Sequence, residues 1–225
     1  MTRTEPVPLA DFPDRFAPAH TALLIIIDMQ KDFCVDGFAA SAAGRPLQAA
    51  QAIVPAIADL RAAARRAGVL VCHVGFWTLP GHLSDSGPWL AQRRRSTYAS
   101  DRIAIAGTRG ADFVPELSPV EGEVGVHKHR YSAFKGTDLD MVLRAHGIAA
   151  VAVCGVSTNV CVESTLHDAF EHGYYVTAVG DACASWDTDL HRASPAGRRV
   201  SGSRSASGVK SAMARDPPRS MRAAQ

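Results

Sequence analysis

Short apolar runs alternate along the chain with longer stretches in which apolar residues recur at helical spacing. Residues 21–27 (TALLIII) are too short and too continuously apolar for an amphipathic helix, so they predict a strand buried on both faces. Such strands are typical of parallel sheets, and four further runs of this kind predict strands over 69–76, 124–127, 149–156 and 174–181.

The stretches between these runs predict helices over 47–67, 137–147 and 159–173. Residues 77–119 show no clear periodicity and predict a loop with a short helix around 88–94. Gly68 is a good C-cap for the helix over 47–67, and Pro55 is either tolerated near its first turns or kinks it. Strands that alternate with helices of this length indicate an α/β protein with a three-layer α/β/α architecture and a mostly parallel sheet. Ligands of such sheets bind beyond the carboxyl ends of the strands, where the strand order reverses.

Composition divides the 225 residues into three parts: an N-terminal extension (1–19), one domain (20–193) and a basic Ser/Arg-rich tail (194–225). The tail contains seven Lys and Arg against one acidic residue, seven Ser and three Pro. We expect it to be disordered and unable to bury a strand. Its abrupt start suggests a frameshift in the coding sequence, and the alternative is a basic interaction tail.

Several classes of protein are excluded by composition and charge. The longest apolar run is far shorter than the roughly 20 residues of a membrane-spanning helix, and the N-terminus does not resemble a signal peptide, so we expect a cytoplasmic protein. Residues 1–193 contain 17 basic and 21 acidic residues, which argues against a nucleic-acid partner. Five scattered cysteines without a C-x-x-C pair predict reduced thiols.

Three residues could combine into one reactive site, because each lies at the end of a predicted strand or in the following turn. Asp28 follows the first strand, Lys128 the third, and Cys161 lies in the first turn of helix 159–173. The helix dipole at that position is expected to lower the thiol pKa towards a thiolate. If their side chains meet in one cleft, Asp28 would act as a base, Lys128 as its electrostatic partner and Cys161 as the nucleophile. The alternative for each residue is structural: an Asp that begins a loop, a Lys at the surface and a Cys packed in the core.

Three motifs resemble the isochorismatase-like cysteine hydrolase superfamily over residues 20–193: LLIIIDMQKDF, HKHRYSAFKGTDLDMVLRAHGI and CGVSTNVCVESTLHDAFEHGYYVTAVGDACAS. The match is closest to the branch of ureidoacrylate amidohydrolases and biuret hydrolases, in which K-x-R-Y-S-x-F is typical. The resemblance implies a catalytic triad of Asp28, Lys128 and Cys161 and a cis peptide at the Val156–Ser157 bond. It also implies a last strand and helix, which residues 194–225 do not match.

The resemblance further implies a thioester mechanism, with backbone amides of Ser157 and Cys161 as the oxyanion hole. It places Tyr131, Phe134 and Asn159 at the substrate or its entrance. Phe33 and Trp77 are plausible residues of the pocket lining, and the alternative for both is packing in the core. Gln30 either binds substrate or stabilises the loop after Asp28.

We expect no metal and no cofactor. Nicotinamidase relatives carry an Asp-x-His pair and a further His, whereas here His73 lies within a strand and His82 in a loop, and this spacing does not favour zinc. His127 and His129 flank Lys128 on the opposite face of an extended segment, as structural or surface groups.

The predicted function is therefore a cysteine amidohydrolase that acts on a small ureido or carbamoyl compound and assembles as a dimer or tetramer, as its relatives commonly do. Two alternatives stay open. An isochorismatase-type vinyl-ether hydrolase is disfavoured by Cys161, because those relatives lack the nucleophilic cysteine. A non-catalytic remnant is favoured only by the tail.

Overall fold

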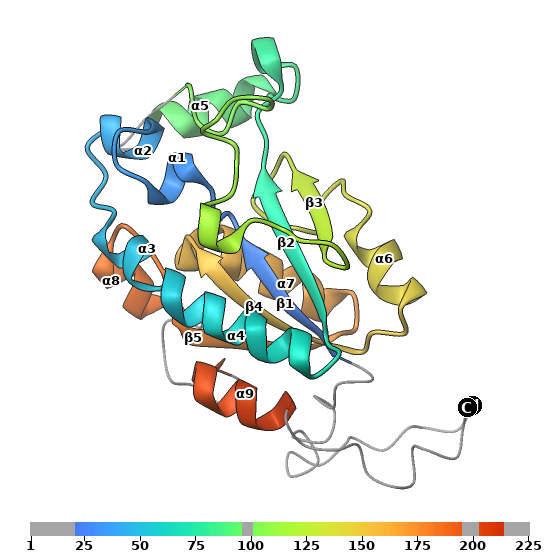
Figure 1. Ribbon diagram of the computed structural model, residues 1–225. Coiled ribbons are helices and arrows are strands. Elements are labelled where there is room, and N and C mark those ends of the chain that lie inside the picture. Colours follow the sequence, from blue (N-terminus) through green and yellow to red (C-terminus); the bar gives the residue numbers. More distant parts are fainter. Residues whose placement is uncertain (1–20, 96–100, 195–202, 214–225) are drawn as a thin grey trace, which may run out of the picture.

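A six-stranded sheet runs through the centre of the computed structural model, which describes residues 21–95, 101–194 and 203–213 (Figure 1). The strand order is β3-β2-β1-β4-β5-β6, and every neighbouring pair is parallel. The bounds are β1 Thr21–Ile27, β2 Leu70–Phe76, β3 Val124–Lys128, β4 Ala150–Val156, β5 Tyr175–Ala184 and β6 Ser203–Arg204. The five strands expected from the apolar runs are confirmed, and so is the α/β class.

Helices cover both faces of this sheet. In Figure 1, α4 lies in front of the sheet and α7 lies behind it, while α9 lies below α4 and contacts both α4 and β5. The α-helices are α1 Lys31–Cys34, α2 Ala39–Ala42, α3 Gln48–Ala52, α4 Val54–Arg66, α5 Gly87–Arg95, α6 Leu139–Ala145, α7 Glu163–Glu171, α8 Thr188–Ala193 and α9 Ala206–Met213. Short 3-10 turns form at Pro80–His82 and Pro115–Leu117, and a π-helix spans Thr158–Val162. The central strands are fully enclosed: Ile25, Ile26 and Ile27 of β1 have no exposed surface, and every residue of β4 is buried.

Two predicted helices differ in detail from the observed ones. The helix expected over 47–67 is divided at Ile53 into α3 and α4, because Pro55 lies in the first turn of α4, where a missing N–H is tolerated. The helix expected over 159–173 begins as a π-helix, Thr158–Val162, and only then continues as α7. The wider π turn is common at functional sites.

The prediction that the tail cannot contribute a strand is wrong for residues 203–213. Ser203 and Arg204 pair with Ala178 and Val179 of β5, and α9 packs against α4 and β5. Ala206, Val209 and Met213 are buried, and their spacing forms the inner face of a short helix. The composition of residues 194–225 does not reveal this pattern, because small residues surround the three apolar positions. Residues 195–202 and 214–225, like the extension 1–19, lie outside the described residues.

The strand order reverses between β1 and β4, and a close backbone approach joins these two strands at their carboxyl ends. Gly155 of β4 has φ +114°, and a Cβ there would overlap the carbonyl oxygen of Ile27. Only glycine fits such a contact. It brings the ends of β1 and β4 together directly before Asp28 and Ser157.

Among the described residues, no helix has the length and apolarity that crossing a membrane would require.

Candidate active site

The three residues singled out from the sequence meet at the carboxyl edge of the sheet. Asp28 directly follows β1, Lys128 is the last residue of β3, and Cys161 lies in the π-helix after β4. Lys128 Nζ is 2.9 Å from Asp28 Oδ2 and 3.3 Å from Cys161 Sγ. The ammonium therefore bridges the carboxylate and the thiol.

The Lys128 ammonium is fully buried and has three polar partners. Besides Asp28 and Cys161, it donates to the carbonyl oxygen of Arg130 at 3.1 Å. Its Nζ also lies 5.0 Å from the centre of the Phe76 ring. The interpretation of Lys128 as a surface lysine is therefore wrong, and this charge belongs to the site.

The Asp28 carboxyl is held by backbone geometry that few residues adopt. Its φ is +53°, and its backbone N–H donates to the Val74 carbonyl oxygen at 2.8 Å. Burial raises the pKa of this carboxyl, although the Lys128 charge opposes the shift. Asp28 Oδ1 is buried, and no described residue donates a well-aligned hydrogen bond to it. The Cys161 thiol interacts with the same carboxyl and opposes part of the rise in its pKa.

The expectation of a lowered thiol pKa at Cys161 is wrong for this structure. Burial and the neighbouring Asp28 carboxylate raise the pKa of Cys161 to about 12, and Lys128 offsets only part of this shift. The thiol is therefore protonated at neutral pH. Burial alone would lower the pKa of Lys128, but Asp28 and Cys161 raise it, so its amine stays an ammonium. The resting site is a thiol beside a carboxylate–ammonium pair.

The loop that carries Cys161 is fastened to the end of β5 by a triangle of side chains. Ser157 Oγ and Ser185 Oγ lie 2.9 Å apart, and both donate to Asn159 Oδ1, at 3.0 and 2.7 Å. The peptide bond between Val156 and Ser157 is cis. Because its carbonyl oxygen accepts both bonds, the Asn159 amide group is oriented with its nitrogen as the remaining donor.

Two further contacts fix the same loop from other directions. His191 Nδ1 of α8 lies 2.8 Å from the hydroxyl of buried Thr158. Thr165 Oγ1 donates to the Cys161 carbonyl oxygen at 2.7 Å and accepts from the Ala133 N–H at 3.1 Å. The segment after β3 is thereby tied to the helix that carries the thiol.

A cluster of aromatic rings lies beside the ammonium. Trp89 of α5 packs against Phe76 at 6.3 Å and against Tyr131 at 4.6 Å between ring centres, and the Arg130 guanidinium lies 5.0 Å from the Trp89 ring. Burial raises the pKa of Tyr131, and a charge on Cys161 adds to this shift. The Tyr131 phenol therefore lies within electrostatic range of the thiol.

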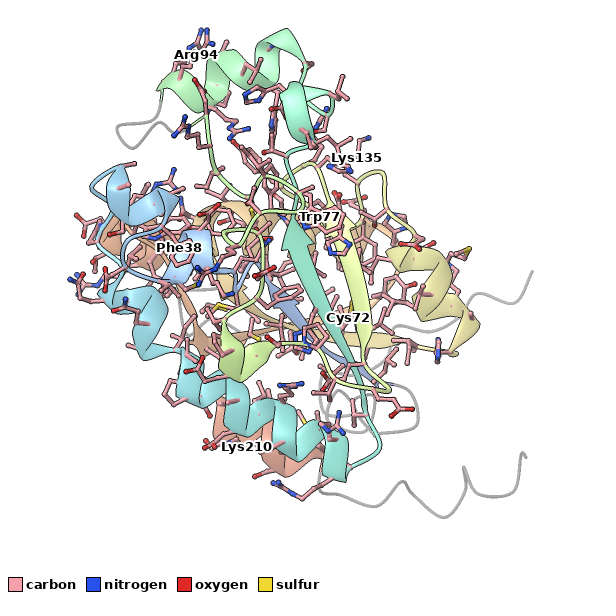
Figure 2. The ribbon with its side chains drawn as sticks, turned by 45° about the horizontal axis from the view of Figure 1, so that its top comes forward. Phe38, Cys72, Trp77, Arg94, Lys135 and Lys210 are labelled. Atoms are coloured by element: carbon pink, nitrogen blue, oxygen red, sulfur yellow. The ribbon has the colours of Figure 1, made fainter. Side chains whose placement is uncertain are left out.

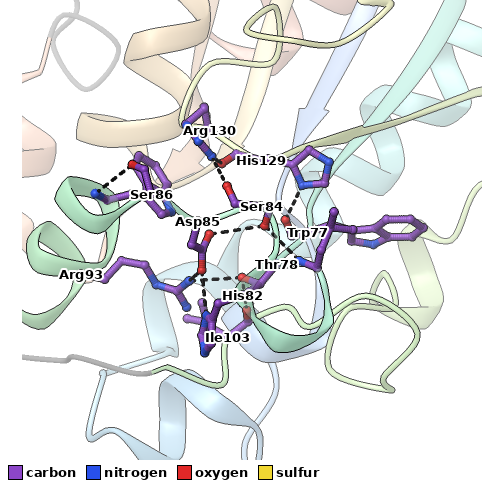
Figure 3. Close-up of polar contacts among 12 residues, drawn as sticks. Trp77, Thr78, His82, Ser84, Asp85, Ser86, Arg93, Ile103, His129 and Arg130 are labelled. Carbon is purple, nitrogen blue, oxygen red and sulfur yellow. Dashed lines mark hydrogen bonds and ion pairs between the residues drawn. The ribbon is translucent and has the colours of Figure 1, made fainter.

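Helix α5 is held against the domain by a polar network around Asp85 (Figure 3). The Asp85 carboxylate is buried and bonds His82 Nδ1 at 2.8 Å and Arg93 Nη1 at 3.1 Å. Arg130 donates to the Ser84 carbonyl oxygen at 2.9 Å. This network fixes Trp89 and Tyr131 relative to the triad.

Two residues predicted to bind substrate have structural roles instead. Gln30 is buried, and its side-chain amide bonds the backbone of Phe76 and Ala111, so it supports the loop after Asp28. Phe134 is buried against His172 and Tyr174, near the end of α7 that is remote from Cys161. Phe33 is 7% exposed and packs against Trp186, so its contacts agree with the alternative of core packing.

The histidines form no metal-binding group among the described residues, which contain no cluster of three His, Cys, Asp or Glu side chains that could hold an ion. Trp77 directly follows β2 (Figure 2). His127 stacks on Trp77 with ring centres 3.5 Å apart, and His129 bonds the Trp77 carbonyl oxygen (Figure 3). Trp77 and His127 help to line a cavity of about 510 Å³ whose lining does not include the triad. His73 is buried against Glu123.

Comparison with known proteins places this geometry in a family. The Isochorismatase domain model matches residues 22–203. The chain belongs to the isochorismatase family. Two relatives named ureidoacrylate amidohydrolase RutB are each 35% identical to it. The protein of Methylorubrum extorquens aligns over 73% of this chain and 70% of its own length, and that of Stutzerimonas stutzeri over 79% and 76%.

Solved structures agree with this assignment. An isochorismatase family protein from Desulfovibrio vulgaris is 32% identical, with a TM-score of 0.73 over 86% of this chain and 98% of that one. The N-carbamoylsarcosine amidase of Thermoplasma acidophilum is 27% identical, with a TM-score of 0.63 over 82% and 94%. Family and relatives together identify the chain as a hydrolase.

Several residues of the site were not singled out from the sequence. Ser185 and His191 lie in and just after the third motif, but their roles depend on contacts with the Ser157–Asn159 loop. Trp89 lies in a stretch without helical periodicity, so nothing local indicated its position beside Tyr131. Only the packing of distant segments reveals these residues.

Proposed function

We propose that the chain is a cysteine-dependent amidohydrolase that cleaves a C–N bond of a small ureido or carbamoyl compound through an acyl thioester. The RutB relatives support a hydrolase acting on C–N bonds of linear amides. The observation that carries the proposal is the bridge of the buried Lys128 ammonium between Asp28, at 2.9 Å, and Cys161, at 3.3 Å.

Asp28 acts as the general base in this mechanism. Because the pKa of Cys161 is about 12, the thiol needs a base before it can attack. The raised pKa of Asp28 makes its carboxylate a better proton acceptor than an ordinary aspartate. Transfer of the proton from Cys161 to Asp28 leaves one negative charge beside Lys128, which the ammonium stabilises in either position.

The thiolate then attacks the carbonyl carbon, forming a C–S bond and placing negative charge on the oxygen. The backbone amides of Ser157 and Cys161 act as the oxyanion hole. Protonated Asp28 gives its proton to the leaving nitrogen as the C–N bond breaks. Water, deprotonated by the same carboxylate, then hydrolyses the thioester and regenerates the thiol.

The substrate lies between the thiol and the side chains that face it. The Tyr131 phenol lies within electrostatic range of Cys161, and the Asn159 amide nitrogen is oriented by the two serine hydroxyls. Both can hydrogen-bond a carbamoyl group, so they are the substrate-binding residues of this proposal. Assembly into a dimer or tetramer stays a prediction.

The test is ammonia release from ureidoacrylate, biuret, N-carbamoyl amino acids and nicotinamide by the wild type and by Cys161→Ala. We expect turnover of a ureido or carbamoyl substrate, at least about 10³-fold lower in Cys161→Ala. Mass spectrometry of a rapidly quenched reaction should show the acyl group on the peptide that contains Cys161. Cys34→Ala, a buried cysteine outside the bridge, serves as the control and should keep activity.

Two results would contradict the proposal. Appreciable amide hydrolysis by Cys161→Ala would exclude the thioester. Hydrolysis of isochorismate, with none of the amides cleaved, would favour the vinyl-ether reaction.

A further inference from the structure

The hydroxyl of Thr158 lies inside the segment that carries the proposed oxyanion hole and the thiol. Thr158 directly follows Ser157 and precedes Cys161 by three residues. The residue has no exposed surface, so its hydroxyl cannot bond bulk water. Among the described residues this hydroxyl bonds one side chain, that of His191, whose Nδ1 lies 2.8 Å away. Loss of His191 would therefore leave a buried polar group unpaired, which is unfavourable.

The backbone of the same segment connects Thr158 to the reacting sulfur. The Ser157 carbonyl oxygen accepts hydrogen bonds from the N–H groups of Val160 and Val162, at 3.1 and 3.2 Å. These two residues flank Cys161 on either side. Because the segment is bonded in this way, a shift of Thr158 also moves the Ser157 and Cys161 amides and the thiol.

His191 comes from α8, a short helix that contacts the π-helix and is fixed at its own N-terminus. The Asp187 carboxylate caps α8 by accepting two backbone N–H bonds, each at 2.9 Å. The His191 N–H donates to the Asp187 carbonyl oxygen at 2.9 Å. Burial and the Arg192 charge lower the pKa of His191, so its ring is neutral at pH 8. A neutral ring offers a donor or an acceptor at Nδ1, and the Thr158 hydroxyl can pair with either.

We propose that His191 is a positioning residue: through the Thr158 hydroxyl, it holds the oxyanion-hole segment and the thiol of Cys161 in the arrangement that the reaction requires. This inference rests on the proposed function, because it assigns a part in that reaction to a residue outside the triad. The contact joins α8, which follows the last long strand of the sheet, to the loop after β4.

The test measures kcat and KM on whichever of ureidoacrylate, biuret, the N-carbamoyl amino acids and nicotinamide the wild type cleaves fastest. His191→Leu replaces Nδ1 by a carbon, whereas His191→Asn keeps a polar atom at the same place along the side chain. Thr158→Val removes the hydroxyl, and Thr158→Ser keeps it. We expect His191→Leu and Thr158→Val each to lower kcat by about 10- to 100-fold, because small displacements of reacting groups slow a reaction strongly. His191→Asn and Thr158→Ser should stay within about 3-fold of the wild type, because the hydrogen bond is kept.

KM should change by less than about 3-fold, because Asn159 is held separately by the Ser185 hydroxyl at 2.7 Å. The double variant Thr158→Val/His191→Leu should lose no more activity than either single variant, since all three lack the same hydrogen bond. Leu190→Asn is the matched control: this neighbour of His191 on α8 is 49% exposed, and both kinetic constants should stay unchanged.

Alkylation of Cys161 by iodoacetamide at pH 8 reports the position of the thiol without any substrate. Burial raises the pKa of this thiol, so a loosened segment that admits water should make it react several-fold faster. Mass spectrometry of each cysteine-containing peptide follows the labelling. The four other cysteines are buried, and their labelling rates correct for global unfolding of a variant.

The two measurements separate failure of this inference from failure of the proposed function. Wild-type kcat in His191→Leu, equal losses in His191→Asn and His191→Leu, or losses that multiply in the double variant would overturn the positioning role and leave the amidohydrolase proposal intact. If no amide is cleaved, the proposed function fails and the labelling decides. The role of His191 in holding the segment then stands if Cys161 alone is labelled faster in His191→Leu and Thr158→Val, and otherwise it falls.

Discussion

Lys128 Nζ lies 2.9 Å from Asp28 Oδ2, and neither side chain is more than 3% exposed. A buried ion pair contributes little net stability, because desolvation of the two charges offsets their attraction. Loss of one partner is costly, since the other charge is left buried without compensation. The two residues therefore depend on each other for stability.

Lys128→Met should destabilise the protein by about 3 kcal/mol at pH 8, because Asp28 is then buried without its cation. The loss should be smaller at pH 5, where Asp28 neutralises itself more easily by binding a proton. Urea unfolding at both pH values measures this difference. The double variant Asp28→Asn/Lys128→Met should recover part of the stability but no activity; equal stability of the single and double variants would contradict the coupling.

Gly155→Ala should destabilise the protein by about 2–4 kcal/mol, because the added Cβ would overlap the Ile27 carbonyl oxygen in a strained backbone conformation. Gly68→Ala is the matched control: its φ is +68°, but no atom lies within 4 Å of the added Cβ. It should cost only about 1–2 kcal/mol. Chemical unfolding of both variants measures the contrast, and equal losses would show that conformation alone, and not the contact, matters.

Acid should destabilise the protein through His73. Burial lowers the pKa of this histidine to about 4, although Glu123 opposes the shift. The unfolded chain, with a pKa near 6.5, binds the proton first, so the free energy of unfolding falls as pH drops from about 6.5 to 4. Unfolding of the wild type and His73→Gln across this range should show a smaller slope in the variant. Parallel slopes would assign the acid sensitivity to other groups.

Helix α9 should contribute measurably to stability. Val209 is 5% exposed and lies on the face that packs against α4 and β5. Val209→Asp would bury an unpaired carboxylate, and we expect a loss of at least about 2 kcal/mol. Ser211→Ala, at an exposed position of the same helix, should change stability by less than about 0.5 kcal/mol. Equal stability of the two variants would show that α9 does not pack as described.

The sheet could be predicted because its strands are buried on both faces and therefore appear as uninterrupted apolar runs. The runs at 21–27 and 149–156 correspond closely to β1 and β4. Strand β6 could not be predicted in this way, because two residues carry no periodicity. Helix α9 has an inner face of only Ala206, Val209 and Met213, which average composition conceals.

The meeting of Asp28, Lys128 and Cys161 was predictable from strand ends and family motifs, but the electrostatics of these side chains were not. A cysteine in the first turn of a helix predicts a lowered pKa only while the site is open to solvent. At Cys161, burial and the Asp28 carboxylate outweigh the helix end. The sequence left Gln30 as either a substrate-binding or a loop-supporting residue, and the family resemblance placed Phe134 at the substrate. Only their partners, the Phe76 backbone and the rings of His172 and Tyr174, show that they support the structure.

The Lys128 ammonium already contacts Asp28, Cys161 and the Arg130 carbonyl oxygen. It therefore has no N–H group left to bind the substrate directly. In the proposed mechanism, Lys128 is a fixed counterion between Asp28 and Cys161, which exchange one proton. The site would then alternate between a thiol beside a carboxylate and a thiolate beside a carboxylic acid. Because these two states have the same total charge, no ion has to enter or leave the protein interior during bond cleavage.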